Sequence, residues 1–151
     1  MDARTAAALV PELYVTELSR SLSFYVDLLG FAIDYNRPED RFASIVLGTA
    51  RIMLEETPSL RAATPAEFAR GEWRTAELLT PFGRGVNLQV DVPDVERISS
   101  RLAAARYPVL LAPYERSYRV GRGSLMVRQL LVADPDGYLI RPAQRLGAPV
   151  D

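Results

Sequence analysis

Histidine, cysteine and lysine are all absent from this sequence, so each of its 18 basic residues is an arginine. Without cysteine the chain can form no disulfide and has no thiolate. Without histidine, a serine or threonine nucleophile would need a lysine or a carboxylate as its base, and there is no lysine. Composition therefore excludes the usual nucleophilic triads and dyads.

Long hydrophobic runs are also missing. No apolar stretch approaches the roughly 18 residues that cross a bilayer, and Met1–Ala8 has no apolar segment of signal-peptide length. The 18 basic and 19 acidic residues leave a net charge of −1, which gives no global case for binding nucleic acid. We therefore expect a cytoplasmic protein with neither a membrane nor a nucleic acid as partner.

What the sequence does contain is one pattern that occurs twice. Leu9–Val15 and Val86–Val92 each alternate apolar and polar residues, as a half-buried strand does. Each is followed by an amphipathic helical segment, Ser19–Gly30 or Pro93–Arg106, and then by further strands that end in a hairpin. A period of this size indicates a repeat. The sequence predicts an α+β chain of two βαβββ modules.

The two helices have identifiable ends. Gly30 follows the first helix where a left-handed C-cap is needed, and Asp94 precedes the second as its N-cap. Spacings of three and four residues define a buried stripe on each helix. The predicted stripes are Leu18, Leu22, Tyr25, Val26 and Leu29 on the first helix, and Val95, Ile98, Leu102 and Ala105 on the second.

Turn residues predict two hairpins. Phe42–Leu47 and Ala50–Glu56 are joined around Gly48-Thr49. The last strands, roughly Ser124–Ala133 and Tyr138–Gln144, are joined by Asp-Pro-Asp-Gly, which suits a type I turn. We read the two carboxylates of that turn as structural.

A long connection separates the two modules. In it, Thr64 and Glu67 have the spacing of a capping box around Pro65, which predicts a short helix near Pro65–Arg70. Connections of this length often act as lids or arms. Trp73 has two open interpretations, closing over a binding face or packing in the core. We place module one at about residues 8–57, the connection at about 58–84 and module two at about 85–145, within a single domain over 1–151.

Several segments resemble one known superfamily. They are Val10–Leu13, Ser21–Tyr25, Leu28–Phe31, Phe82–Asn87 and Asp134–Arg141. In this order they resemble the vicinal oxygen chelate superfamily, which includes glyoxalase I, ring-cleaving dioxygenases and bleomycin resistance proteins, and most of all the bleomycin resistance branch. The resemblance implies two modules that form an incomplete barrel-like cup. It also implies a homodimer with clefts between modules of the two subunits, in which the N-terminal strand crosses to the partner near Pro11.

Metal-binding members of this superfamily take their ligands from four strand positions. The resemblance places these positions at Val10, Met53, Asn87 and Arg141. Valine has no donor atom, methionine offers a soft thioether, and arginine carries a fixed positive charge. Asn87 alone offers an oxygen that a hard cation would accept. We therefore predict no metal and no other cofactor.

Because alternate residues of a strand point to the same face, polar side chains lie together on the face where the metal would lie. A polar sheet face turned to water needs no ligand, and this interpretation stays open beside that of a ligand-binding cup. Aromatic groups available for stacking are Tyr14, Trp73, Phe82, Tyr114 and Tyr118. The candidate ligand-binding residues are Glu12, Tyr14, Arg51, Met53, Glu55, Trp73, Asn87, Gln89, Asp91, Tyr118 and Arg141.

The resemblance implies a non-catalytic function, the binding and sequestration of a small molecule such as an antibiotic. No catalytic residue is assigned. An enzyme of the same superfamily, a glyoxalase- or dioxygenase-like lyase or oxidoreductase with a non-standard or absent metal site, stays open, as does a protein-interaction module. Charges of both signs among the candidates leave the ligand open. Arg141 should point into the cup, opposite Ile140, with Glu12 as one candidate partner.

Overall fold

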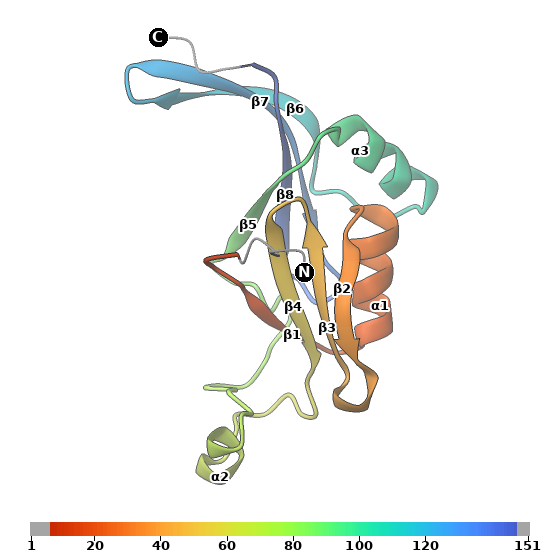
Figure 1. The fold of residues 1–151 in the computed structure, drawn as a ribbon, viewed down its shortest axis with the longest axis vertical. Coiled ribbons are helices and arrows are strands. Elements are labelled where there is room, and N and C mark those ends of the chain that lie inside the picture. Colours follow the sequence, from red (N-terminus) through yellow and green to blue (C-terminus); the bar gives the residue numbers. More distant parts are fainter. Residues whose placement is uncertain (1–6, 148–151) are drawn as a thin grey trace, which may run out of the picture.

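Two four-stranded sheets, one from each half of the chain, form the fold of the computed structural model, which describes residues 7–147 (Figure 1). The first sheet has the order β1-β4-β3-β2 and the second the order β5-β8-β7-β6. In each sheet the first strand runs parallel to the last, and the other pairs are antiparallel. This shared topology confirms the predicted α+β architecture of two βαβββ modules. The strands are β1 Glu12–Val15, β2 Ala32–Arg37, β3 Phe42–Leu47, β4 Ala50–Glu56, β5 Asn87–Asp91, β6 Leu111–Val120, β7 Gly123–Ala133 and β8 Leu139–Arg145.

The strand boundaries agree with the sequence in most places. The hairpin of β3 and β4 has the predicted ends, and β7 and β8 lie within one residue of theirs. The predicted first strand is too long, because β1 begins only at Glu12 and Leu9 is 80% exposed. Strand β6 forms with β7 a long hairpin that projects from the body (Figure 1).

The first helix changes its geometry partway along. It begins as α1 (Leu18–Leu22) and continues as a π-helix, η1 (Ser23–Leu28). The wider π turns rotate the side chains that follow, so Phe24 is buried where Val26 was predicted, and Val26 is only partly buried. Tyr25 and Leu29 lie in the core as predicted. Gly30 ends the helix with φ +91°, the left-handed conformation expected of it.

The second helix, α3 (Val95–Ala104), follows its prediction except at its end. The backbone N–H of Arg97 donates to Asp94 Oδ1 at 3.1 Å, which confirms the N-cap. Val95, Ile98 and Leu102 are buried. Ala105 is exposed because the helix has already ended at Ala104, so its predicted place in the stripe is wrong. Two short helices complete the fold, η2 (Pro38–Asp40) and α2 (Pro65–Ala69). No helix within residues 7–147 is long and apolar enough to cross a membrane.

Both modules contribute to one hydrophobic core. It combines Leu13 and Leu54 from the first sheet with Val90 and Ile140 from the second. Helices α1/η1 and α3 lie side by side over it (Figure 1). The rings of Phe24 and Tyr107 meet across the boundary between the modules, with their centroids 5.1 Å apart. The apolar faces of both sheets therefore point toward a common interior.

The Asp-Pro-Asp-Gly turn has a larger role than the sequence indicates. Gly137 N–H donates to Asp134 O at 3.0 Å, which confirms the turn. The two carboxylates then reach across to module one. Tyr25 Oη donates to Asp134 Oδ2 at 2.8 Å, and the N–H and hydroxyl of Thr16 donate to Asp136 at 3.1 and 2.6 Å. Asp134 and Asp136 are only 3% and 4% exposed. The turn is therefore a buried polar tether between the modules.

Replacing Tyr25 by phenylalanine is expected to lower the free energy of unfolding by about 1.5–3 kcal/mol, because the buried Asp134 Oδ2 loses its donor. Denaturant unfolding at neutral pH measures this. Tyr35→Phe is the matched control, since Tyr35 is 40% exposed, and it should change stability by less than about 0.5 kcal/mol. Equal effects of the two substitutions would contradict the tether.

Candidate functional site

Each sheet has one face toward the core and one face opposite it, which we call the first and the second open face. On the first sheet, Leu13 and Val15 are buried while Glu12 and Tyr14 point the other way. Register places Glu12 beside Met53 and Tyr14 beside Glu55. On the second sheet, Ile140 is buried, and register places Arg141 beside Gln89. The predicted strand parity is therefore confirmed.

Two carboxyl groups meet on the first open face. Glu12 lies beside Met53 on the neighbouring strand and so comes close to Glu55, two residues further along β4. Burial, and then the hydrogen bond and negative charge of Glu12, raise the pKa of Glu55 to about 7. Glu55 is therefore a group that can gain or lose a proton near neutral pH.

Arg51 is already paired within its own sheet. Its Nη1 donates to Asp34 Oδ2 at 2.6 Å and to Ser44 Oγ at 2.9 Å. Both charged side chains are largely buried, with 18% and 16% exposed for Arg51 and Asp34. The sequence treats Arg51 as a group available to a ligand, whereas the structure uses its charge to neutralise a neighbour.

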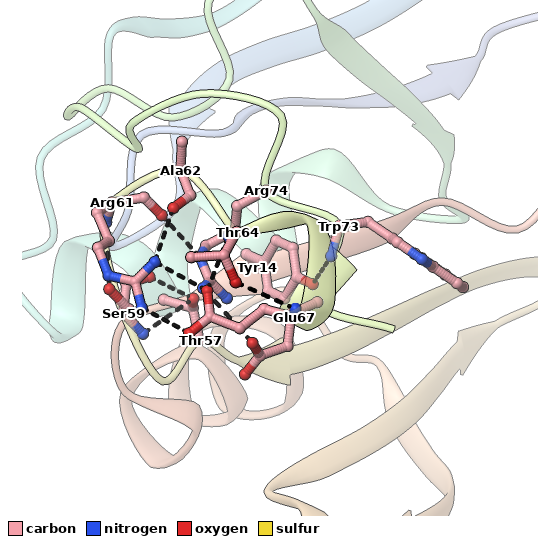
Figure 2. A network of polar contacts seen from close by, with 10 residues as sticks. Tyr14, Thr57, Ser59, Arg61, Ala62, Thr64, Glu67, Trp73 and Arg74 are labelled. Atoms are coloured by element: carbon pink, nitrogen blue, oxygen red, sulfur yellow. Dashed lines mark hydrogen bonds and ion pairs between the residues drawn. The ribbon is translucent and has the colours of Figure 1, made fainter. Parts of the chain in front are cut away.

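The connection between the modules is held in place beside this face (Figure 2). Arg74 is 2% exposed, and its Nε donates to Arg61 O at 2.8 Å. Its Nη2 lies 3.6 Å from Glu67, the carboxylate that completes the capping box with Thr64. This buried arginine fixes the residue that precedes it, Trp73.

Trp73 lies on the surface, with 60% of its area exposed, so the interpretation that it packs in the core is wrong. Its backbone N–H donates to the hydroxyl of Tyr14 at 2.9 Å, which anchors it at the edge of the first open face (Figure 2). The indole itself points away from the polar network in Figure 2. Burial raises the pKa of Tyr14, so its hydroxyl keeps its proton at neutral pH.

A polar cluster on the second open face was missed by the sequence prediction. The side chain of Gln129 is buried at 1% exposure, and its Nε2 lies 2.6 Å from Tyr114 Oη and 2.7 Å from Tyr118 Oη. Its Oε1 has no partner within the described chain. The only signal in the sequence was a single amide within an apolar strand, and Tyr114 was noted solely as an aromatic group.

Arg141 lies on the same face, and no ion pair joins it to another residue of the described range 7–147. Its Nε is buried without a hydrogen-bond partner among residues 7–147, and the predicted ion pair with Glu12 is not formed. Asp91, the acid nearest in strand register, is occupied by Arg145 at 3.2 Å and by the amide of Gln89 at 3.1 Å. Arg141 is thus a partly buried cation whose Nε lacks an acceptor among the described residues.

A cavity of about 640 Å³ opens along the second face. Asn87, Leu139 and Ala133, which form the next row of the sheet beside Gln89 and Arg141, line one wall. The loop before β5 and Leu110, the residue directly before β6, line the rest of the cavity. Gly137 is required here, because a side chain would approach Pro81 to 2.4 Å and its φ is +91°.

The candidate residues therefore form two separate groups. Glu12, Tyr14, Met53 and Glu55, with Trp73 at the edge, belong to the first face. Asn87, Gln89, Asp91, Tyr118 and Arg141 belong to the second. Between residues 7 and 147 no hydrogen bond or ion pair joins a candidate side chain of one group to one of the other. The same part of the chain contains no cluster of three or more acidic side chains that could hold a metal ion.

Comparisons with known proteins show the family and the fold of the chain. The sequence model described as "Glyoxalase/Bleomycin resistance protein/Dioxygenase superfamily" matches residues 6–141. A superfamily member from Vibrio splendidus is 35% identical over 91% of this chain and 97% of its own, with a TM-score of 0.40. A glyoxalase/dioxygenase from Nostoc punctiforme is 18% identical over 97% and 94%, with a TM-score of 0.64. Lactoylglutathione lyase from Agrobacterium tumefaciens is 18% identical over 91% and 92%, with a TM-score of 0.56. None of the curated proteins matches the chain.

Glu55 is expected to make stability depend on pH between about 4.5 and about 7. Its pKa in the folded protein, about 7, lies above its ordinary value of 4.5, so the folded protein binds this proton more tightly than the unfolded chain. The stabilising contribution is complete below pH 4.5 and is lost as pH rises through about 7. Glu55→Gln should flatten this part of a plot of melting temperature against pH.

Two further variants make this test specific. Glu12→Gln should shift the same transition to lower pH, because it removes a negative charge beside Glu55. Glu77→Gln, at an exposed position of the connection, should keep the wild-type profile. A slope that survives in Glu55→Gln would show that another group titrates.

Proposed function

Since the chain belongs to the glyoxalase/bleomycin resistance protein/dioxygenase superfamily, we propose that it is a metal-free member that binds and sequesters a small molecule on its open faces. Its α+β fold of paired βαβββ modules is the vicinal oxygen chelate fold. More specifically, we propose that it acts as bleomycin resistance proteins do, with antibiotics as one class of ligand.

The residues at the superfamily's metal positions do not fit a metal. They are Val10, Met53, Asn87 and Arg141, and Arg141 brings a permanent positive charge to the place where a cation would lie. A guanidinium whose Nε is buried without an acceptor would repel a divalent ion further. No step of the proposed function therefore passes through a metal.

One observation carries the proposal, namely the unpaired Arg141 on a face beside a cavity of ligand size. A partly buried guanidinium cannot lose its charge, so it needs a carboxylate, a ligand or water. The neighbouring volume of about 640 Å³ lies within the usual range of small-molecule sites. A solvated polar sheet face would require neither the cavity nor the burial.

An enzymatic role is the second candidate, and Glu55 is the observation that favours it. A carboxyl group with a pKa of about 7 is suited to general acid–base catalysis at neutral pH. The tyrosine hydroxyl beside it in register, Tyr14, supplies a hydrogen-bonding group. A turnover that Glu55→Gln abolishes while ligand binding is retained would establish this alternative.

Protein purified without chelator is expected to contain far less than one equivalent of zinc, nickel, manganese or iron per chain by elemental analysis. In a thermal-shift panel, these metals should leave the melting temperature unchanged. At least one small molecule, glycopeptide antibiotics included, should raise it. A ligand at one hundred times its Kd stabilises by about 2.7 kcal/mol, which such a panel detects. One bound metal per chain would contradict the proposal.

A homodimer is expected in solution, because the two groups of candidate residues remain apart within one chain and both open faces are uncovered. Exposed apolar side chains such as Leu110 and Leu111 also favour a partner surface. Light scattering should give twice the 16.8 kDa mass of the chain at micromolar concentration. A mass of one chain would count against this part.

A further inference from the structure

We propose that the ligand of the second open face is an amphipathic anion, with its acidic group at Arg141 and its apolar part in the neighbouring cavity. This inference rests on the proposed small-molecule function and names its ligand class. It combines three observations, which are an unpaired buried donor, a buried amide cluster and an apolar cavity on consecutive rows of one sheet.

Arg141 supplies the first part of the site. Its Nε is buried and has no acceptor among the described residues. The acid that register brings nearest, Asp91, is already shared by Arg145 and Gln89. A buried donor without an acceptor costs free energy, and an oxygen anion that reaches Arg141 removes this cost.

The Gln129 cluster also offers donors, whichever way its amide is oriented. With Nε2 toward the tyrosines, the hydroxyl hydrogens of Tyr114 and Tyr118 are free to donate elsewhere. With the amide turned over, both hydroxyls donate to its oxygen, and the NH₂ group becomes the free donor. The separations of 2.6 and 2.7 Å suit either O–H donor geometry or short N–H bonds. In the first orientation Gln129 Oε1 stays buried without a donor, whereas in the second the free buried group is the NH₂ donor, and this orientation favours an acceptor oxygen of the ligand.

The sheet register brings these two groups together. Gln129 is directly opposite Ala143, and Arg141 lies two residues before Ala143 on the same strand and the same face. Diagonal neighbours of this kind have side-chain origins about 7–8 Å apart, which one carboxylate and an adjacent polar group can span. The donors of the site are thus aligned along β7 and β8.

The cavity determines the rest of the molecule. Leu139, two residues before Arg141 on the same face, lines it together with the exposed side chains of Val86 and Leu110. Arg84, its one charged lining residue, donates its Nε and Nη2 to the carbonyls of Pro81 and Thr80. An apolar or aromatic group about the size of a drug molecule therefore fits beside the anion.

Three fluorescent naphthalene probes that differ in charge test the inference. They are the anionic 8-anilinonaphthalene-1-sulfonate, the neutral N-phenyl-1-naphthylamine and the cationic dansylcadaverine. The wild-type protein should bind the anion saturably and at least tenfold more tightly than the other two. Arg141→Gln should remove this preference while leaving the affinity for the neutral probe unchanged. Arg97→Gln, at an exposed arginine of α3 away from this face, is the matched control and should keep the preference.

A second pair of variants covers the case in which Arg141→Gln does not fold. Leu110→Asp places a carboxylate at the cavity, at a position that is 58% exposed. It should lower the affinity for the anionic probe at least tenfold more than the affinity for the neutral probe. Leu60→Asp, at a similarly exposed leucine outside the cavity, should have no effect.

The outcomes separate the two proposals. Saturable binding of the neutral or cationic probe with no preference for the anion would overturn this inference and leave small-molecule binding intact. If the preference for the anionic probe survives both Arg141→Gln and Leu110→Asp, the anion does not bind at Arg141 beside this cavity, and the inference is overturned. Failure of all three probes to bind saturably would overturn the inference and count against the proposed function itself.

Discussion

The buried tether between the Asp134–Gly137 turn and module one is the constraint on which the rest of this structure depends. Each module contributes the apolar face of its sheet to one common core. The carboxylates of Asp134 and Asp136 accept hydrogen bonds from Tyr25 and Thr16, and so fix how the two apolar faces meet. Burial of this kind is tolerated because each carboxylate has several donors. Once the apolar faces are joined, the polar faces are left on the outside, where they are available to a ligand or to a second chain.

The two open faces differ in their electrostatics. On the first, burial and the neighbouring Glu12 raise the pKa of Glu55, and the positive charge of Arg51 is used within the sheet. On the second, Arg141 is unpaired and lies near groups that donate hydrogen bonds. A ligand that spans both faces, as a dimer would allow, would meet an acidic side and a basic side. The carboxyl groups of Glu12 and Glu55 are thus separated in space from the guanidinium of Arg141, on different faces of the molecule.

The residues at the superfamily's metal-binding positions also bear on the chemistry of these faces. The resemblance to the superfamily places the four metal-ligand positions at Val10, Met53, Asn87 and Arg141, and three of these side chains offer no donor suited to a hard divalent cation. A fixed cation in place of a metal ion can still attract an anionic group, but it cannot act as a Lewis acid or generate a hydroxide. This favours binding over metal-assisted chemistry, while Glu55, with a pKa of about 7, is suited to proton transfer at neutral pH.

The sequence by itself determined the repeat, the strand parity, the caps and the turns, because these depend on local periodicity and on residues whose conformational preferences act over a few positions. Gly30, Asp94, the capping box at Thr64 and the Asp-Pro-Asp-Gly turn all behave as predicted. Only the tertiary structure decided the π-helix that buries Phe24, the exposure of Trp73, the pairing of Arg51 with Asp34 and the cluster around Gln129. Each of these depends on contacts between residues far apart in the chain or across strands, where the partner's identity is not encoded in the spacing. Arg141 shows both limits, since parity predicted its face correctly, while its lack of a partner could be seen only once Asp91 was found paired with Arg145.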